Sequence, residues 1–155
     1  MNPLTITWAP NLYTDWGYKN FEAWVNSGFH NFKVTANPLA HRLLTRLSTE
    51  LLFHPFQPFF IGQKCFAPKF ALKLDIPLIF YGENEAEYGN PLNDNDSAIR
   101  DYEYFTNNKE EELFLGGTSI SILKQDFGMS DADLSPFMPI DLRPLKEKGI
   151  ETHYL

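Results

Sequence analysis

The chain has 155 residues, of which 43% are hydrophobic and 15% aromatic, so it can bury a core and is too short for two ordinary domains. Its net charge of −7, without a cluster of lysine or arginine, argues against binding to nucleic acid or to anionic membrane surfaces. No apolar run approaches the roughly 18 residues of a membrane span, and the first ten residues lack a signal-peptide pattern. We therefore expect one cytoplasmic domain.

Cysteine usage agrees with that compartment. Cys65 is the only cysteine, which excludes an internal disulfide and a zinc site built from several cysteines. Buried filler is a better interpretation of this thiol than a nucleophile.

Strand and helix signals alternate at the start of the chain. Apolar residues at every second position predict a strand over 4–8. Thr14 and Asp15 are typical of a helix start, and Gly28 is typical of a left-handed helix end. A second strand is predicted over 31–36.

The clearest helix signal follows. Asn37 and Pro38 form a good N-cap and first-turn pair, and Pro55 should end the helix near His54. The predicted apolar face consists of leucines at four-residue spacing, namely Leu39, Leu43, Leu47 and Leu51.

Helical spacing resumes over 59–74, where Pro68 should kink the helix or divide it in two. The continuous apolar run at 77–82 is typical of a central parallel strand with helices on both faces. Residues 89–108 are polar and predict a long surface excursion.

The last third of the chain gives shorter signals. A helix is predicted over 118–127, a capping box at Ser130 and Asp133, a helix over 144–148 that ends at Gly149, and a strand over 150–155. The alternation of strands and helices predicts an α/β fold with a doubly wound parallel sheet.

Three acidic side chains follow the apolar run. If the backbone stays extended, Glu83, Glu85 and Glu87 project to one side, a crowding of carboxylates that favours Mg²⁺ or a raised pKa. Ligands of open α/β sheets bind beyond the carboxyl ends of strands, which is where these residues lie. A polar exit loop is the alternative interpretation.

Two further clusters are candidates for ligand binding. His41 and Thr45 share a helix face opposite the leucines, while Arg42 and Arg46 share another face and can grip a phosphate or carboxylate. A solvated helix face is the common alternative. Prolines, aromatics and amides over 54–64 suit a sugar or a nucleobase, or else simple packing.

Several long segments of the sequence resemble N-acetyl sugar amidotransferases of the lipopolysaccharide and pseudaminic-acid type, within the PP-loop ATP-pyrophosphatases. These segments are TITWAPNLYTDWGYKNFEAWVNSGF, HRLLTRL, LLFHPFQPFFIGQK, APKFALK and IFYGENEAEYGN. The resemblance is dense from Met1 to about Asn90 and loose beyond. It implies a Rossmann-like sheet of the adenine nucleotide alpha hydrolase type.

The resemblance also implies a reaction. Such enzymes use ATP and Mg²⁺ to activate the carbonyl oxygen of a sugar N-acetyl group, release pyrophosphate, and let ammonia displace AMP to leave an acetamidino group. The ammonia is supplied by a glutaminase with a cyclase-like partner, and the other partner is an N-acetylated sugar or nucleotide sugar. Surface-polysaccharide biosynthesis is the implied setting.

The resemblance also implies roles for individual residues, according to their positions in the matching segments. Glu83, Asn84 and Glu87 are the implied catalytic residues, and Glu83 and Glu87 the implied Mg²⁺ ligands. The strand at 5–8 would receive adenine through backbone groups. The residues expected to bind nucleotide or sugar are Thr7, Trp8, His41, Arg42, Arg46, Gln63, Lys64 and Gly82.

The sequence departs from the family in one respect. The phosphate loop Ser-Gly-Gly-x-Asp-Ser and the strand before it would precede residue 1, and the family continues past Leu155. We therefore expect a middle fragment that is inactive alone and poorly soluble. The alternative function is a non-catalytic module that binds an adenine nucleotide or nucleotide sugar; glycosidase and tRNA-thiolation functions fit less well.

Overall fold

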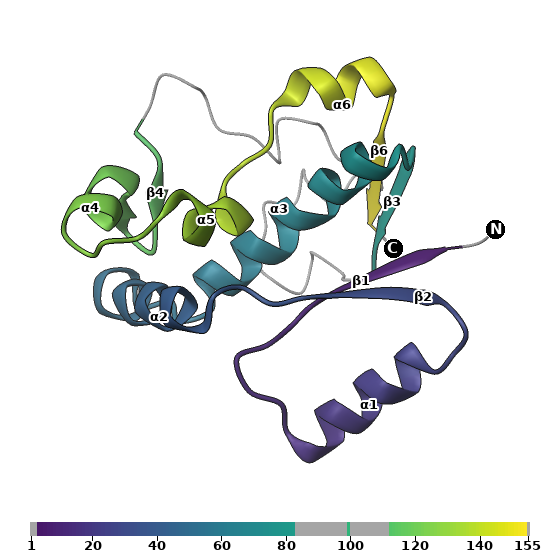
Figure 1. Cartoon of the computed structure of the whole chain (residues 1–155), viewed down its shortest axis with the longest axis horizontal. Helices are drawn as coiled ribbons and strands as arrows, with labels where there is room; N and C mark the ends of the chain where they lie inside the picture. The colour runs from purple at the N-terminus through teal and green to yellow at the C-terminus, as the bar shows by residue number, and fades with distance from the viewer. Residues whose placement is uncertain (1–2, 83–98, 100–111, 155) are drawn as a thin grey trace. The chain divides into compact units, whose positions relative to one another are not determined.

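The computed structural model describes residues 3–82, 99 and 112–154. The chain divides into a first unit, Met1–Gln63 with Leu113–Phe137, and a second unit, Lys64–Glu112 with Met138–Leu155. The division falls inside helix α3 (Gln57–Leu74). Each unit holds a pair of parallel strands together with helices, so the α/β class is confirmed (Figure 1). Within the described ranges, no helix is long and apolar enough to cross a membrane.

The first unit is built on strands β1 (Leu4–Trp8) and β2 (His30–Val34), which pair in parallel. Helix α1 (Asp15–Val25) joins them and lies along one side of the pair (Figure 1). The predicted start is confirmed, because the Thr14 side chain accepts a hydrogen bond from Gly17 N. The helix ends at Asn26, before Gly28, whose φ of 97° lies in the turn that follows.

Helix α2 (Pro38–Leu52) follows β2 and is capped by Asn37, whose side-chain oxygen accepts from Leu39 N at 3.0 Å. The four-residue leucine line does not form its buried face. Leu39 and Leu51 are 74% and 54% exposed, because each step of four residues advances about 40° around a helix of 3.6 residues per turn. The residues of α2 that are buried are Ala40, His41, Leu44, Leu47 and Ser48.

Residues 113–137 complete the first unit. A tight hairpin joins β4 (Phe114–Leu115) to β5 (Thr118–Ser119), so helix α4 (Ile120–Gln125) begins two residues later than predicted. Helix α5 (Asp131–Leu134) has the predicted capping box, and the 3-10 helix η4 (Ser135–Phe137) follows it directly.

The second unit pairs β3 (Leu78–Tyr81) in parallel with β6 (Glu151–Tyr154), and helix α6 (Leu142–Lys148) leads into β6. Helix α3 is not divided at Pro68, whose ring is fully buried. The core of this unit consists of Ala71, Ile79, Tyr81, Leu145, Ile150 and Tyr154.

The prediction that β3 is covered on both faces is wrong for the described structure. Its exposure alternates: Ile79 and Tyr81 are buried, whereas Leu78 and Phe80 are exposed. An unbroken apolar run in the sequence does not show whether a strand is buried on one face or on two. In either case the residues that point to the buried face are apolar.

Candidate functional site

The carboxyl end of the β1–β2 pair is the candidate site of the first unit, since ligands of α/β folds bind beyond the carboxyl ends of parallel strands. Trp8 is the last residue of β1 and is 7% exposed. Its indole meets Phe137 with ring centroids 5.7 Å apart. Gly62 of α3 lies so close that a Cβ there would be 2.2 Å from the indole. Trp8 therefore forms a fixed apolar wall.

His41 lies against this wall from helix α2. Its ring centroid is 6.4 Å from that of Trp8 and 5.8 Å from that of Phe137, and the residue is 4% exposed. Burial lowers the pKa of the imidazole, because charging it inside an apolar contact costs solvation energy. The structure thus corrects the prediction that His41 faces away from the apolar side of the helix, and it holds a neutral imidazole there.

A polar network links the starts of two helices in the same unit. Asn37 donates from Nδ2 to Oδ1 of Asp133 at 2.7 Å, while Oδ2 of Asp133 accepts from the backbone and hydroxyl of Ser130. Ser130 above all, and Asn37 after it, hold the pKa of Asp133 below its ordinary value. The network joins residues 96 positions apart and fixes the start of α2 beside that of α5.

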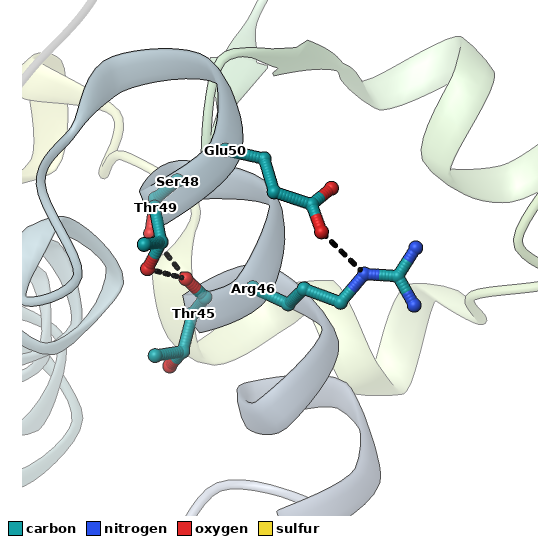
Figure 2. Close-up of polar contacts among 5 residues, drawn as sticks. All are labelled: Thr45, Arg46, Ser48, Thr49 and Glu50. Atoms are coloured by element: carbon teal, nitrogen blue, oxygen red, sulfur yellow. Dashed lines mark hydrogen bonds and ion pairs between the residues drawn. The ribbon is translucent and has the colours of Figure 1, made fainter.

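The two arginines of α2 do not form a free pair of cations. Arg46 donates from Nε to Oε1 of Glu50 at 3.1 Å, as Figure 2 shows, while Arg42 is exposed. Figure 2 also shows the Thr45 carbonyl accepting from both Ser48 Oγ and Thr49 Oγ1. An anion would have to compete with Glu50 for Arg46, so the solvated-face interpretation fits Arg46 best.

The other predicted binding residues lie in both units. Thr7 faces its neighbour strand and accepts from Asn31 Nδ2 at 3.0 Å. Gln63 is half-buried at the end of the first unit. In the second unit, the backbone oxygen of Lys64 accepts from the Tyr81 hydroxyl at 2.8 Å, and Gly82 is exposed directly after β3.

The predicted catalytic residues Glu83, Asn84 and Glu87 lie outside the described residues, and so does the implied Mg²⁺ site at Glu83 and Glu87. Among the residues that the structure does describe, no group of three or more His, Cys, Asp or Glu is placed to hold a metal. These assignments therefore stay predictions.

The second unit has its own strand ends. Tyr81 and Tyr154 are partners across the β3–β6 pair, and their rings stack with centroids 4.9 Å apart at 11°.

Cys65 and Lys69 lie one turn apart on α3. Desolvation by burial raises the pKa of Cys65 and lowers that of Lys69. The half-buried thiol accordingly stays protonated rather than acting as an activated nucleophile.

Sequence reasoning missed Phe137 and the connection of Asn37 to Asp133. The capping box at Ser130 was a usable signal for Asp133, because it fixes that carboxylate at a helix start. No local pattern identifies the distant partner of either residue. A comparison with protein-family models and a search of curated proteins both find no match to this chain.

Proposed function

We propose that this chain forms part of an ATP-dependent amidotransferase that converts a sugar N-acetyl group to an acetamidino group in surface-polysaccharide biosynthesis. The complete fold of this enzyme would be a Rossmann-like, doubly wound sheet of the adenine nucleotide alpha hydrolase type. ATP and Mg²⁺ are its proposed cofactors, and an N-acetylated sugar and ammonia-supplying subunits are its proposed partners.

The observation that carries the proposal is the parallel β1–β2 pair, which ends at Trp8 beside the start of α2. Parallel pairs joined by a helix are the building unit of nucleotide-binding α/β sheets, and their carboxyl ends receive the ligand. The rigid contacts of Trp8 with Gly62, His41 and Phe137 supply a dry wall at this end.

The remaining roles rest on the sequence resemblance. Glu83 and Glu87 would hold Mg²⁺, and Asn84 would orient the group that reacts. The exposed Arg42 and the backbone at Gly82 would contact anionic parts of the substrates. Arg46 would do so only after leaving Glu50, with which it pairs at 3.1 Å.

Glu87 gives the direct test in a full-length N-acetyl sugar amidotransferase, with Glu87→Gln introduced at the matching position. Loss of the metal-binding charge should lower amidine formation by at least about a hundredfold, measured as pyrophosphate release that depends on the sugar. Glu110→Gln, in the acidic stretch far along the chain, is the matched control. Turnover within a few-fold of the parent for Glu87→Gln would contradict the proposed role.

Nucleotide binding without chemistry is the second candidate function, because the parallel β1–β2 pair would suit a nucleotide in either case. Saturable ATP binding with no pyrophosphate release in a full-length protein would favour it. Release of pyrophosphate that requires an N-acetyl sugar, with acetamidino product that requires ammonium, would favour the amidotransferase.

A further inference from the structure

The face of the β1–β2 pair that lies toward α1 is polar. Side chains alternate across strands, and the register places Thr5 opposite Asn31 and Thr7 opposite Lys33. These four side chains share one face, since Asn31 donates from Nδ2 to Thr5 Oγ1 at 2.8 Å and to Thr7 Oγ1 at 3.0 Å. The opposite face carries the apolar residues Leu4, Ile6, Trp8, Phe32 and Val34.

Aromatic rings from the α1 segment stand over this polar face. The Lys33 ammonium lies 5.8 Å from the ring centroid of Tyr13 and 5.4 Å from that of Phe21. The two rings are themselves 5.8 Å apart. Lys33 therefore joins the polar face to an aromatic border, with its charge held by cation–π attraction rather than by an acid.

Three groups at this face keep unused hydrogen-bonding capacity within the described part of the chain. The Tyr13 hydroxyl is buried and has no hydrogen-bond partner there. Among the described residues, Lys33 has no acidic partner, and the Asn31 carboxamide oxygen accepts no bond. Burial raises the pKa of Tyr13, so its hydroxyl stays a neutral donor. Buried polar groups are normally satisfied, and an unsatisfied one calls for a ligand or ordered water.

Helix α1 is held loosely over the polar face. It has no buried residue, and Trp16 on its surface is 73% exposed. A helix that buries so little can shift without losing much hydrophobic stabilisation. A shift of α1 could therefore make room for a small polar ligand without a change in the rest of the first unit.

We propose that Asn31, Lys33 and Tyr13 bind a hydroxylated carboxylate, such as a sugar acid, on the polar face of the β1–β2 pair. One ammonium matches the single charge of a carboxylate, whereas phosphate sites usually add arginine or free backbone N–H groups. The Asn31 oxygen and the Thr7 hydroxyl suit ligand hydroxyls, and the Phe21 ring suits the C–H face of a sugar. The proposal does not depend on the amidotransferase function.

Calorimetric titration of the full chain with glucuronate tests the proposal, with glucose and glucose 6-phosphate as comparison ligands. We expect glucuronate to bind with a Kd of about 1 mM, and each comparison ligand at least about tenfold more weakly. Lys33→Met should weaken glucuronate binding at least about tenfold. Lys19→Met is the matched control, because Lys19 lies over the exposed Trp16 ring, 4.7 Å from its centroid, and should leave the affinity unchanged.

Tyr13→Phe separates binding from folding. It keeps the ring and removes only a buried hydroxyl without a partner, so the thermal midpoint should not fall, while glucuronate affinity should drop about threefold or more. The proposal is overturned if glucuronate fails to bind at about 10 mM, if glucose binds equally well, or if Lys33→Met in a folded protein leaves the affinity unchanged.

Discussion

The imidazole of His41 meets the indole of Trp8 edge to face, with ring centroids 6.4 Å apart and ring planes at 66°. The contact joins the end of β1 to the first turns of α2, and Phe137 contacts both rings. A titratable ring thus occupies an apolar position at the end of a parallel strand. The stability of the first unit should therefore depend on pH and on the shape of this contact.

Acid should destabilise the first unit through His41. Its folded pKa lies below the ordinary value of 6.5, so the neutral ring contributes stability that is fully present above pH 6.5 and is lost as pH falls through the folded pKa. Each unit of depression corresponds to about 1.4 kcal/mol. Urea unfolding between pH 7.5 and 5 measures the slope, which His41→Gln should reduce. A slope that stays unchanged in His41→Gln would contradict the assignment.

Gly62 should not tolerate a methyl group. Alanine in a helix interior usually stabilises by about 0.5–1 kcal/mol relative to glycine. Here the new Cβ would stand 2.2 Å from Trp8 Cζ2, so Gly62→Ala should instead destabilise by about 1–3 kcal/mol. Chemical denaturation measures the sign. Gly82→Ala, where a Cβ meets nothing within 4 Å, should change stability little. A stabilising Gly62→Ala would show that the Trp8 contact is looser than described.

Asn37 should act both as a helix cap and as a partner of Asp133. Asn37→Ala removes both roles and should cost about 1 kcal/mol, whereas Asn37→Ser retains a capping oxygen and should cost less. Both variants should raise the pKa of Asp133 only modestly, because the Ser130 bonds that lower it most remain. NMR titration of the Asp133 carboxyl carbon measures this shift. An unchanged Asp133 pKa in both variants would rule out the Asn37 contact in solution.

Cys65 should react slowly in the folded protein. Burial raises the pKa of its thiol, and only the thiolate attacks a disulfide reagent. Ellman's reagent at pH 8 should therefore label native protein at least about tenfold more slowly than protein in denaturant. Equal rates in both conditions would mean that this part of α3 opens readily.

The sequence was sufficient for local features and insufficient for distant ones. The strand at 4–8, the Asn37-Pro38 helix start and the Ser130–Asp133 capping box each depend on neighbouring residues, and the structure confirms all three. Exposure of individual helix and strand faces depends on what packs from elsewhere. Hence Leu39 and Phe80 were expected inside and are 74% and 55% exposed.

The candidate site divides in the same way. Trp8 and His41 are both predicted to bind ligand. The structure brings them together, but as rings packed against each other rather than as side chains open to a ligand. The Arg42–Arg46 spacing is visible in the sequence, but Glu50 stands one turn further along the same helix and pairs with Arg46. Phe137 could not be found locally, because it reaches Trp8 from a segment more than one hundred residues away.

The proposed function is that of an ATP-dependent N-acetyl sugar amidotransferase, of which residues 1–155 would form a part. A chimera tests it most directly, with this chain replacing the matching segment of a full-length enzyme of that family and ammonium chloride replacing the glutaminase. We measure pyrophosphate release with and without the N-acetyl sugar and with and without ammonium. We expect release that requires the sugar, acetamidino product that requires ammonium, and loss of both in the chimera carrying Glu87→Gln. A folded chimera that releases no pyrophosphate above background, or releases it equally without the sugar, would contradict the proposed function.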